Sequence, residues 1–220
     1  MIKLLAICGS PVKDSNLLHL MREGLKEADR EGVEYELFDM HGKKAQGCIH
    51  CNWCMAKQKA GSYCAVEDDL TGLYPKILEA DGLLIGSPVY LGRLSGHLAS
   101  LLDRTRCLHY GREYAGAMKH KAGAAMAVSW YRNSGLETTL STIHWAFLTY
   151  QMVVAVPGSL STFGGAGLTS LDGTGGFDPK DKHQIFQDAH GIDTARATVK
   201  SLIELTEIIK AGKAAAVTAA

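Results

Sequence analysis

The stretch that decides the fold is Ile2-Lys3-Leu4-Leu5-Ala6-Ile7-Cys8, followed by Gly9-Ser10-Pro11-Val12-Lys13-Asp14-Ser15-Asn16. The first part is an apolar run of the kind found in a strand that is buried on both faces of a parallel sheet. The second part is small and polar, and it leads into a predicted helix at residues 17–31, where leucines and a methionine share one face. Gly32 is the expected C-cap. A buried strand, a polar loop and an amphipathic helix predict the first unit of an α/β sheet.

The same alternation continues along the chain. Further strands are predicted at residues 33–38, 82–87, 121–129 and 151–156, and helices at 68–80 (capped by Asp68-Asp69), 95–104, 135–149 and 193–210. Residues 159–181 are rich in glycine and predict a long loop. Five strands that alternate with helices predict one doubly wound parallel sheet over residues 1–212, with residues 213–220 as a flexible tail. Ligands of such sheets bind beyond the carboxyl ends of the strands.

Composition excludes several classes of function. The chain of 220 residues has 23 Lys plus Arg and 23 Asp plus Glu, so it lacks the excess basic charge of a nucleic-acid-binding protein. No apolar run approaches the ~20 residues that a membrane-spanning helix needs. We therefore expect a cytoplasmic protein without nucleic-acid or membrane partners. In that compartment, clustered cysteines indicate a metal or redox site more often than disulfides.

Four cysteines are concentrated in the connection after the second strand, at residues 40–67. They are Cys48, Cys51, Cys54 and Cys64. Three thiols at CxxCxxC spacing with a fourth nearby suit an iron–sulfur cluster. Structural zinc and unligated thiols remain alternatives, although zinc sites more often use two separated CxxC pairs. Cys8 and Cys107 lie far away in sequence, and we expect each to be a small buried side chain.

Three polar loops follow the first, third and fourth strands. The hydroxyls and backbone N–H groups of residues 10–16, at a helix N-terminus, suit a single phosphate, since neither the Walker nor the GxGxxG pattern is present. The loop Pro88-Val89-Tyr90-Leu91-Gly92 suits the edge of a flat ring. The third loop runs from Ser129 to Thr138. Each loop also has an interpretation without a ligand. The first would be an ordinary strand–helix turn capped by Ser15, Tyr90 of the second would be half-packed on the sheet, and Arg132 of the third would be a solvated charge. His144 and Trp145, on a mostly apolar helix, suit a core or a subunit interface.

Taken together, these motifs resemble a known family. They are Cys8-Gly9-Ser10-Pro11, the cysteine run, Asp68-Asp69, Ala80-Asp81-Gly82 through Gly86-Ser87-Pro88-Val89-Tyr90, Leu101-Leu102-Asp103-Arg104, Arg132-Asn133-Ser134-Gly135-Leu136-Glu137-Thr138 and Phe163-Gly164-Gly165. In this order the chain resembles the NADPH-dependent FMN reductase-like proteins of flavodoxin fold, and within them the iron-sulfur flavoproteins. The resemblance implies a flavodoxin-like sandwich with strand order 2-1-3-4-5 and a cysteine-rich loop inserted after the second strand.

The resemblance also implies two cofactors, FMN and a [4Fe-4S] cluster. Its implied FMN ligands are Ser10, Lys13, Ser15, Asn16, Leu17, Pro88, Val89, Tyr90, Leu91, Gly92, Ser129, Arg132, Gly135 and Glu137. Its implied cluster ligands are Cys48, Cys51, Cys54 and Cys64. The cofactors, and no catalytic side chain, would carry the chemistry.

The implied protein is a homodimer or homotetramer that passes electrons from ferredoxin or NAD(P)H to a small acceptor. Two features depart from the family pattern: the gap from Cys54 to Cys64 is long, and Trp130-Tyr131 replaces small residues. Two other functions remain open. One is an NAD(P)H-dependent FMN or quinone reductase without a cluster. The other is a zinc-stabilised, flavin-binding regulatory or interaction module.

Overall fold

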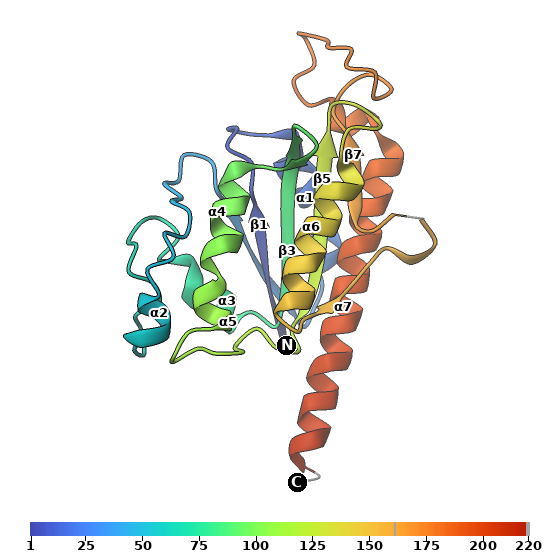
Figure 1. Cartoon of the computed structure of the whole chain (residues 1–220). Helices are drawn as coiled ribbons and strands as arrows, with labels where there is room; N and C mark the ends of the chain where they lie inside the picture. Colours follow the sequence, from blue (N-terminus) through green and yellow to red (C-terminus); the bar gives the residue numbers. More distant parts are fainter. Residues whose placement is uncertain (161, 219–220) are drawn as a thin grey trace.

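A central parallel sheet organises the chain, as the computed structural model shows for residues 1–160 and 162–218 (Figure 1). The strands β1 (Ile2–Cys8), β2 (Val33–Asp39), β3 (Gly82–Tyr90), β5 (Ala122–Ser129) and β6 (Val153–Val154) follow the order β2-β1-β3-β5-β6. This is the order predicted for five parallel strands. The sheet has seven strands rather than five, because β4 (Arg93–Leu94) pairs antiparallel with β3, and β7 (Gly165–Leu168) pairs parallel with β5.

The prediction of a loop throughout residues 159–181 was therefore wrong for β7. Its sequence, Gly-Ala-Gly-Leu, has none of the β-branched or aromatic residues that favour a strand. Parallel pairing with β5 makes this segment a strand. Close packing accounts for one of its glycines, since a Cβ atom at Gly167 would lie only 2.4 Å from Ile185. The predicted loop also includes the last two residues of the η2 turn (Gly158–Leu160), and it includes Ser161, which is outside the described residues.

Helices cover both faces of the sheet (Figure 1). One layer contains α1 (Asn16–Leu25) and α7 (Ala189–Thr218), and the other contains α3 (Leu73–Glu79), α4 (Gly96–Arg104), α5 (Arg106–His109) and α6 (Leu136–Thr149). The short helix α2 (Trp53–Ala56) lies in the cysteine-bearing connection. Each layer packs its apolar residues against its own side of the sheet, so the protein has two cores.

Two helix ends differ from the predicted ones. Helix α1 ends at Leu25 and continues as a short 3₁₀ turn, η1 (Lys26–Ala28), and Gly32, with a φ of +85°, leads into β2. The predicted flexible tail is helical as far as Thr218, because its alanines have high helix propensity. No residue of α7 after Thr206 is buried, and the end of the helix projects beyond the sheet (Figure 1). Residues 219–220 lie outside the described part of the chain.

Helix α3 begins later than predicted, and its N-cap residue is not the predicted one. Asp68 and Asp69 do not cap it, since Gly72 is the N-cap residue and α3 starts at Leu73. At its other end the buried ammonium of Lys121 donates hydrogen bonds to the carbonyl oxygens of Ile77, Leu78 and Ala80 at 2.9, 2.6 and 2.5 Å. These are carbonyls that the helix itself leaves without partners.

No helix in the described part of the chain is both long enough and apolar enough to cross a membrane.

Candidate functional site

A cavity of about 200 Å³ lies where the carboxyl ends of β1, β3 and β5 meet the start of α1. Six of the residues predicted to hold a cofactor line it: Ser10, Ser15, Asn16, Leu17, Pro88 and Tyr90. Five others that the sequence did not single out line it too: Val12, Asp14, Val128, Thr169 and Lys182. The structure thus brings the first and third strand ends together, as expected for a doubly wound sheet.

The first loop is shaped by its own side chains. The Ser15 hydroxyl accepts a hydrogen bond from the backbone N–H of Leu18 at 3.2 Å and so caps α1. The Ser10 hydroxyl accepts one from the N–H of Val12, also at 3.2 Å. The Asn16 side chain links this loop to the 3₁₀ turn η3 (Gln184–Gln187) through hydrogen bonds with Lys182 and Ile185. The loop is preorganised, and the positive end of α1 faces its cavity.

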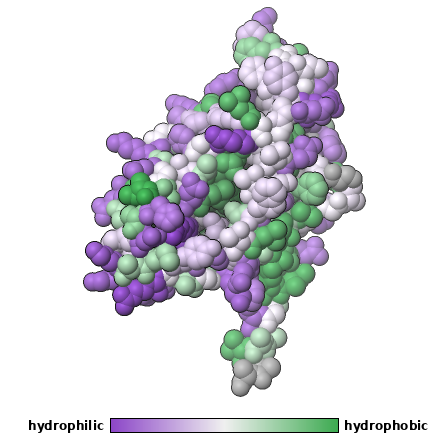
Figure 2. Space-filling view, in the orientation of Figure 1, coloured by the Kyte–Doolittle hydropathy of each residue, from purple (hydrophilic) through white to green (hydrophobic). Residues whose placement is uncertain are grey.

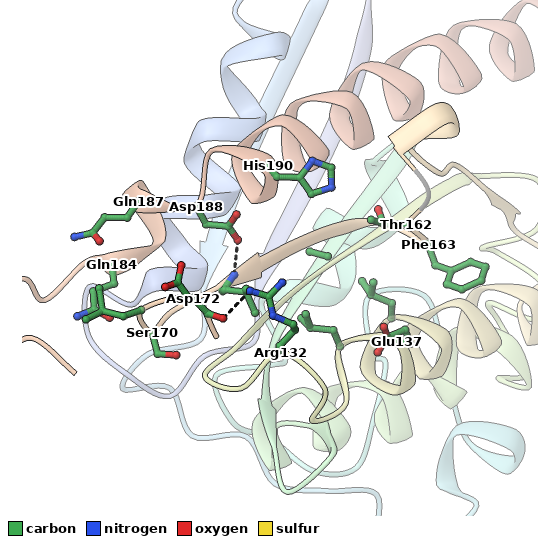
Figure 3. A pocket seen from close by; sticks show the side chains of 15 residues that line it. Arg132, Glu137, Thr162, Phe163, Ser170, Asp172, Gln184, Gln187, Asp188 and His190 are labelled. Atoms are coloured by element: carbon green, nitrogen blue, oxygen red, sulfur yellow. Dashed lines mark hydrogen bonds between the residues drawn. The ribbon is translucent and has the colours of Figure 1, made fainter. Parts of the chain in front are cut away.

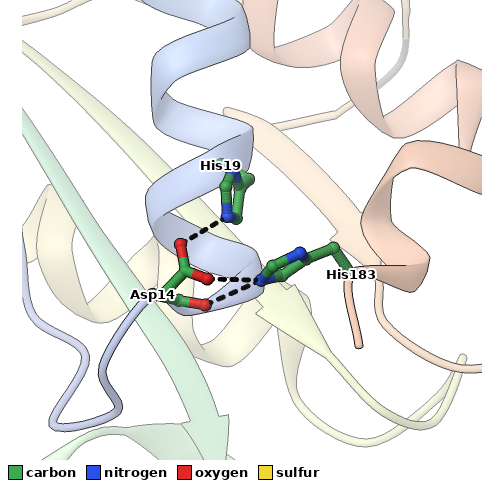
Figure 4. Close-up of side chains that lie close together, drawn as sticks. All are labelled: Asp14, His19 and His183. Atoms are coloured by element: carbon green, nitrogen blue, oxygen red, sulfur yellow. Dashed lines mark hydrogen bonds and ion pairs between the residues drawn. The ribbon is translucent and has the colours of Figure 1, made fainter. Parts of the chain in front are cut away.

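A carboxylate among basic groups borders this loop (Figure 4). The Asp14 carboxylate lies 2.8 Å from Nε2 of His19, 3.0 Å from Nε2 of His183 and 3.3 Å from Nζ of Lys182. Partial burial raises the pKa of Asp14, but hydrogen bonds from His19 and Lys182 outweigh it and hold that pKa below its usual value. The basic groups thus offset the negative charge that Asp14 brings to the loop.

Other residues predicted to bind the cofactor lie outside the lining of this cavity. These are Lys13, Val89, Leu91, Gly92, Ser129 and Gly135. Two of them mark a tight contact between the second and third loops, since a Cβ atom on Gly135 would lie 2.7 Å from the backbone of Gly92. Gly135 has a φ of +115°, which a side chain would strain.

Arg132 and Glu137 lie in a different, larger cavity of about 590 Å³, between α6, β7 and the start of α7 (Figure 3). The Arg132 guanidinium donates a hydrogen bond to the carbonyl oxygen of Asp172 at 2.7 Å. The two cavities share no lining residue. Sequence order suggested a common site, because both residues follow the fourth predicted strand.

The four candidate metal-ligating cysteines lie in the connection between β2 and α3, with Cys48 and Cys51 exposed and Cys54 and Cys64 half-buried. Two non-glycine residues of the segment have left-handed backbone, His50 (φ +53°) and Asn52 (φ +56°). The N–H of His50 donates to the Cys48 sulfur at 3.4 Å, and that of Val66 donates to the Cys64 sulfur at 3.5 Å. Backbone N–H groups directed at thiolates are a common feature of metal–sulfur sites.

These cysteines are not gathered as a single tetrahedral metal ion would require. Four thiolates at the zinc–sulfur distance of about 2.3 Å stand about 3.8 Å apart. Among the described residues, the only groups of three metal-ligating atoms within 4.8 Å of one another are Asp14, His19 and His183, so no three cysteine sulfurs meet this limit. A cluster in which each thiolate binds a different iron accepts wider spacing.

Two arginines of the α4–α5 region contact the cysteine segment. Arg104 donates to the carbonyl oxygen of Val66 at 2.7 Å and pairs with the Asp68 carboxylate at 2.5 Å. Arg106 donates to the Asn52 side chain at 2.9 Å. Burial raises the pKa of Cys54, and the Arg106 charge opposes that shift. Positive charge beside thiols favours their thiolate form.

Gln58 holds the segment between the third and fourth cysteines in place by hydrogen bonds. Its buried amide donates to the carbonyl oxygens of Tyr63 and Cys107 at 2.8 and 3.0 Å, and it accepts from the N–H of Glu113 at 3.0 Å. Cys8 and Cys107 themselves are buried, as predicted, and burial raises the pKa of each to about 12.

Comparisons with known proteins agree on one family. The family model described as NADPH-dependent FMN reductase matches residues 2–165. An iron-sulfur flavoprotein of Methanocaldococcus jannaschii is 36% identical over 210 residues, which is 95% of this chain and 100% of the relative. An iron-sulfur flavoprotein of Methanosarcina thermophila is 30% identical over 210 residues, covering 95% and 97%.

Solved structures share the architecture. RosB, crystallised with 8-demethyl-8-formylriboflavin-5'-phosphate, superposes with a TM-score of 0.73 at 17% identity, covering 100% of this chain and 86% of RosB. A flavodoxin, WrbA-like protein of Agrobacterium tumefaciens has a TM-score of 0.58 at 12% identity, covering 96% and 98%. These likenesses show a flavodoxin-like α/β fold. With the family match and the relatives, they show that the chain is a flavin-dependent oxidoreductase that belongs to the NADPH-dependent FMN reductase family and, within it, to the iron-sulfur flavoproteins.

Proposed function

We propose that this protein is an electron-transfer flavoprotein that holds FMN and a [4Fe-4S] cluster. It would pass electrons from a low-potential donor, ferredoxin or NAD(P)H, through both cofactors to a small acceptor. The observation that carries the proposal is the cysteine segment, in which backbone N–H groups point at thiol sulfurs while Arg104 and Gln58 hold the surrounding chain in place.

The residues around the smaller cavity suit the FMN phosphate. Ser10, Ser15 and Asn16 stand at the N-terminus of α1, and Lys182 offsets the negative charge of Asp14 beside them. An N-terminal helix end with hydroxyl groups stabilises a phosphate dianion. Pro88, Val89, Tyr90, Leu91 and Gly92 would contact the ring, and Lys13, Leu17, Ser129 and Gly135 would complete the site. The other two residues of the sequence prediction, Arg132 and Glu137, line the larger cavity.

The donor set of the cysteine segment suits an iron–sulfur cluster, since it offers three thiols at CxxCxxC spacing and a fourth nearby. Cys48, Cys51, Cys54 and Cys64 would be the ligands. When bound, the cluster supplies one-electron transfer and FMN supplies exchange between one- and two-electron chemistry. The protein's own residues bind these groups and set their surroundings. Arg106 places positive charge near the thiolates, and the partly buried position of Cys54 limits water there.

We also propose a homodimer or homotetramer, on the evidence of an exposed apolar surface. Helix α6 presents Trp145, 66% exposed, and Leu148, 60% exposed, whereas its neighbour His144 is buried at 8%. Figure 2 shows apolar residues gathered above the free end of α7 on the viewed face. Large exposed apolar residues in a group are typical of association surfaces. Residues 1–212 would form the single flavin-binding domain of each subunit.

Anaerobic purification followed by analysis of iron, acid-labile sulfide, zinc and FMN tests the proposal. We expect iron and sulfide in equal amounts, about four of each per chain, beside one FMN. Flavin without iron would instead indicate a cluster-free FMN or quinone reductase. Stoichiometric zinc would indicate a zinc-stabilised module, and either result would contradict the proposed function.

A further inference from the structure

Asp14, His19 and His183 form a cluster of metal-ligating side chains beside the first loop (Figure 4). One carboxylate oxygen of Asp14 lies 2.8 Å from Nε2 of His19, and the other lies 3.0 Å from Nε2 of His183. In the described part of the chain, no other three His, Cys, Asp or Glu side chains bring their ligand atoms within 4.8 Å of one another. Two imidazole nitrogens and a carboxylate therefore surround one small space.

Segments from both ends of the chain hold this cluster together. Asp14 precedes α1 and has left-handed backbone (φ +52°), and His19 lies in the first turn of that helix. His183 comes from the far end of the chain, immediately before η3. The two imidazole centroids are 4.1 Å apart, and Phe186 packs against both rings at 5.2 and 6.3 Å. This packing directs both Nε2 atoms toward the Asp14 carboxylate (Figure 4).

We propose that Asp14, His19 and His183 bind one divalent transition-metal ion, with Zn²⁺ as the ion that fits best. Ligand atoms at about 2.0–2.1 Å from a tetrahedral zinc ion stand about 3.3 Å apart. The two separations in the cluster are within about 0.5 Å of that spacing, so small side-chain rotations would admit the ion. Neutral imidazole is a common ligand of zinc and its neighbours, whereas Mg²⁺ and Ca²⁺ prefer oxygen.

The surroundings of the cluster leave room for such an ion. Lys182 is the competing positive charge, since its Nζ lies 3.3 Å from the Asp14 carboxylate, but its side chain is 66% exposed and is free to turn into solvent. Asp14 lines the cavity proposed for the FMN phosphate, whereas His19 and His183 do not. The ion would therefore lie on the far side of Asp14 from that cavity and would not displace the flavin.

Zinc retention tests the proposal. Wild type, His19→Gln and His183→Gln, purified anaerobically and supplied with FMN, are dialysed against micromolar Zn²⁺, and bound zinc is measured by elemental analysis. Glutamine keeps an N–H donor toward Asp14 but is not a usual zinc ligand. We therefore expect the wild type to retain one more zinc per chain than either variant. Equal zinc contents in the three proteins would overturn the proposal.

The same comparison separates this site from the cysteines. Zinc on the cysteine segment would contribute equally to all three proteins, so the difference between them reports the histidine cluster alone. Zinc that is present in the purified protein and remains in His19→Gln would be bound elsewhere, and such zinc bears on the proposed function instead.

His120→Asn is the matched control. His120 is exposed and precedes β5, at the opposite edge of the sheet from the first loop. Its left-handed backbone (φ +59°) is one that asparagine adopts readily. This variant should retain as much zinc as the wild type. A zinc loss as large as in His19→Gln would indicate unspecific binding to histidines and would also overturn the proposal.

Thermal unfolding gives a second readout, because an ion held only by the folded protein raises its Tm. At about 100 times the dissociation constant, Zn²⁺ should raise the Tm of the wild type by about 5 °C more than that of His19→Gln or His183→Gln. Mg²⁺ should produce no such difference. An equal effect of zinc on the three proteins, or an equal effect of Mg²⁺ and Zn²⁺ on the wild type, would contradict the proposal.

Lys182→Met tests the site in the opposite direction. The substitution removes the positive charge 3.3 Å from the Asp14 carboxylate, so the variant should bind Zn²⁺ at least about threefold more tightly than the wild type. Titration calorimetry measures the two dissociation constants. Weaker or unchanged binding in Lys182→Met would place the ion away from Asp14.

Discussion

The Arg104 guanidinium lies 2.5 Å from the Asp68 carboxylate, and this pair joins the two ends of the cysteine-bearing segment. Both side chains are buried, at 0% and 8% exposure. Asp68 also accepts from the N–H of Gln46, two residues before Cys48, and Arg104 binds the carbonyl oxygen of Val66, two residues after Cys64. The shape of the segment therefore depends on a side chain from α4.

Breaking this pair should destabilise the protein. Arg104→Met leaves the Asp68 carboxylate buried without its partner, so the free energy of unfolding should fall by about 3–5 kcal/mol. Denaturant unfolding measures the change. Arg30→Met is the control, because the Arg30–Glu207 pair is about half exposed on both sides and its loss should change stability by less than about 1 kcal/mol. Equal effects of the two variants would contradict this account of the segment.

The cluster and the flavin should be separable by mutation. Cys51→Ser removes a thiolate ligand from an exposed position, so iron and sulfide should be lost while FMN stays bound. Cys107→Ala is the control, since Cys107 is buried and is not a proposed ligand; it should retain its iron. The iron, sulfide and FMN contents of the anaerobically purified variants test this prediction. Joint loss of iron and flavin in Cys51→Ser would show that the two sites are not independent.

The first loop should distinguish FMN from riboflavin. Ser15→Ala removes a hydroxyl at the start of α1, so FMN affinity should fall about tenfold and helix stability by about 1 kcal/mol. Riboflavin has no phosphate, so its affinity should change much less. Flavin fluorescence titration of the apoprotein measures both constants. An equal loss for the two flavins would place the phosphate elsewhere.

Lys121 should make stability depend on pH above neutrality. Burial lowers its pKa from 10.5 to about 8 in the folded protein. Between these values the unfolded chain holds the proton more firmly, so the free energy of unfolding should rise with pH, by on the order of 1–3 kcal/mol in total. Lys121→Met, which has no ionisable group there, should lose this rise. Denaturant unfolding from about pH 7 to pH 10 measures the free energy of unfolding of the wild type and of Lys121→Met. The same pH dependence in both proteins would contradict a lowered pKa of Lys121.

Much of the fold was predictable because its signals are local. The buried strand Ile2–Cys8 is found as predicted, because continuous apolar residues carry their own information. The helix predicted at residues 95–104 is found as α4, and Ser95 is its N-cap residue. Strand β7 was missed because pairing with β5, rather than its own glycine-rich sequence, makes it a strand. Asp68 and Asp69 resembled a helix cap, yet they bind backbone N–H groups of residues 44 and 46.

The candidate site was predictable only in part, for a related reason. Ser10, Ser15 and Asn16 stand in one short loop, so their grouping was visible in sequence. Lys182 and Thr169 reach the same cavity from the far end of the chain, and no local pattern connects them with that loop. Arg132 and Glu137 were expected on the flavin side from their place after the fourth strand, and in the structure they line the larger cavity.

The central claim is that the cysteine centre passes electrons to FMN. Its most direct test is the rate at which reduced ferredoxin reduces the flavin, followed as the loss of flavin absorbance. Wild-type protein and Cys51→Ser, both loaded with FMN, are mixed anaerobically with the same donor. Because the variant lacks the proposed entry point for single electrons, its flavin should be reduced at least about tenfold more slowly. Equal rates in the two proteins would contradict the claim.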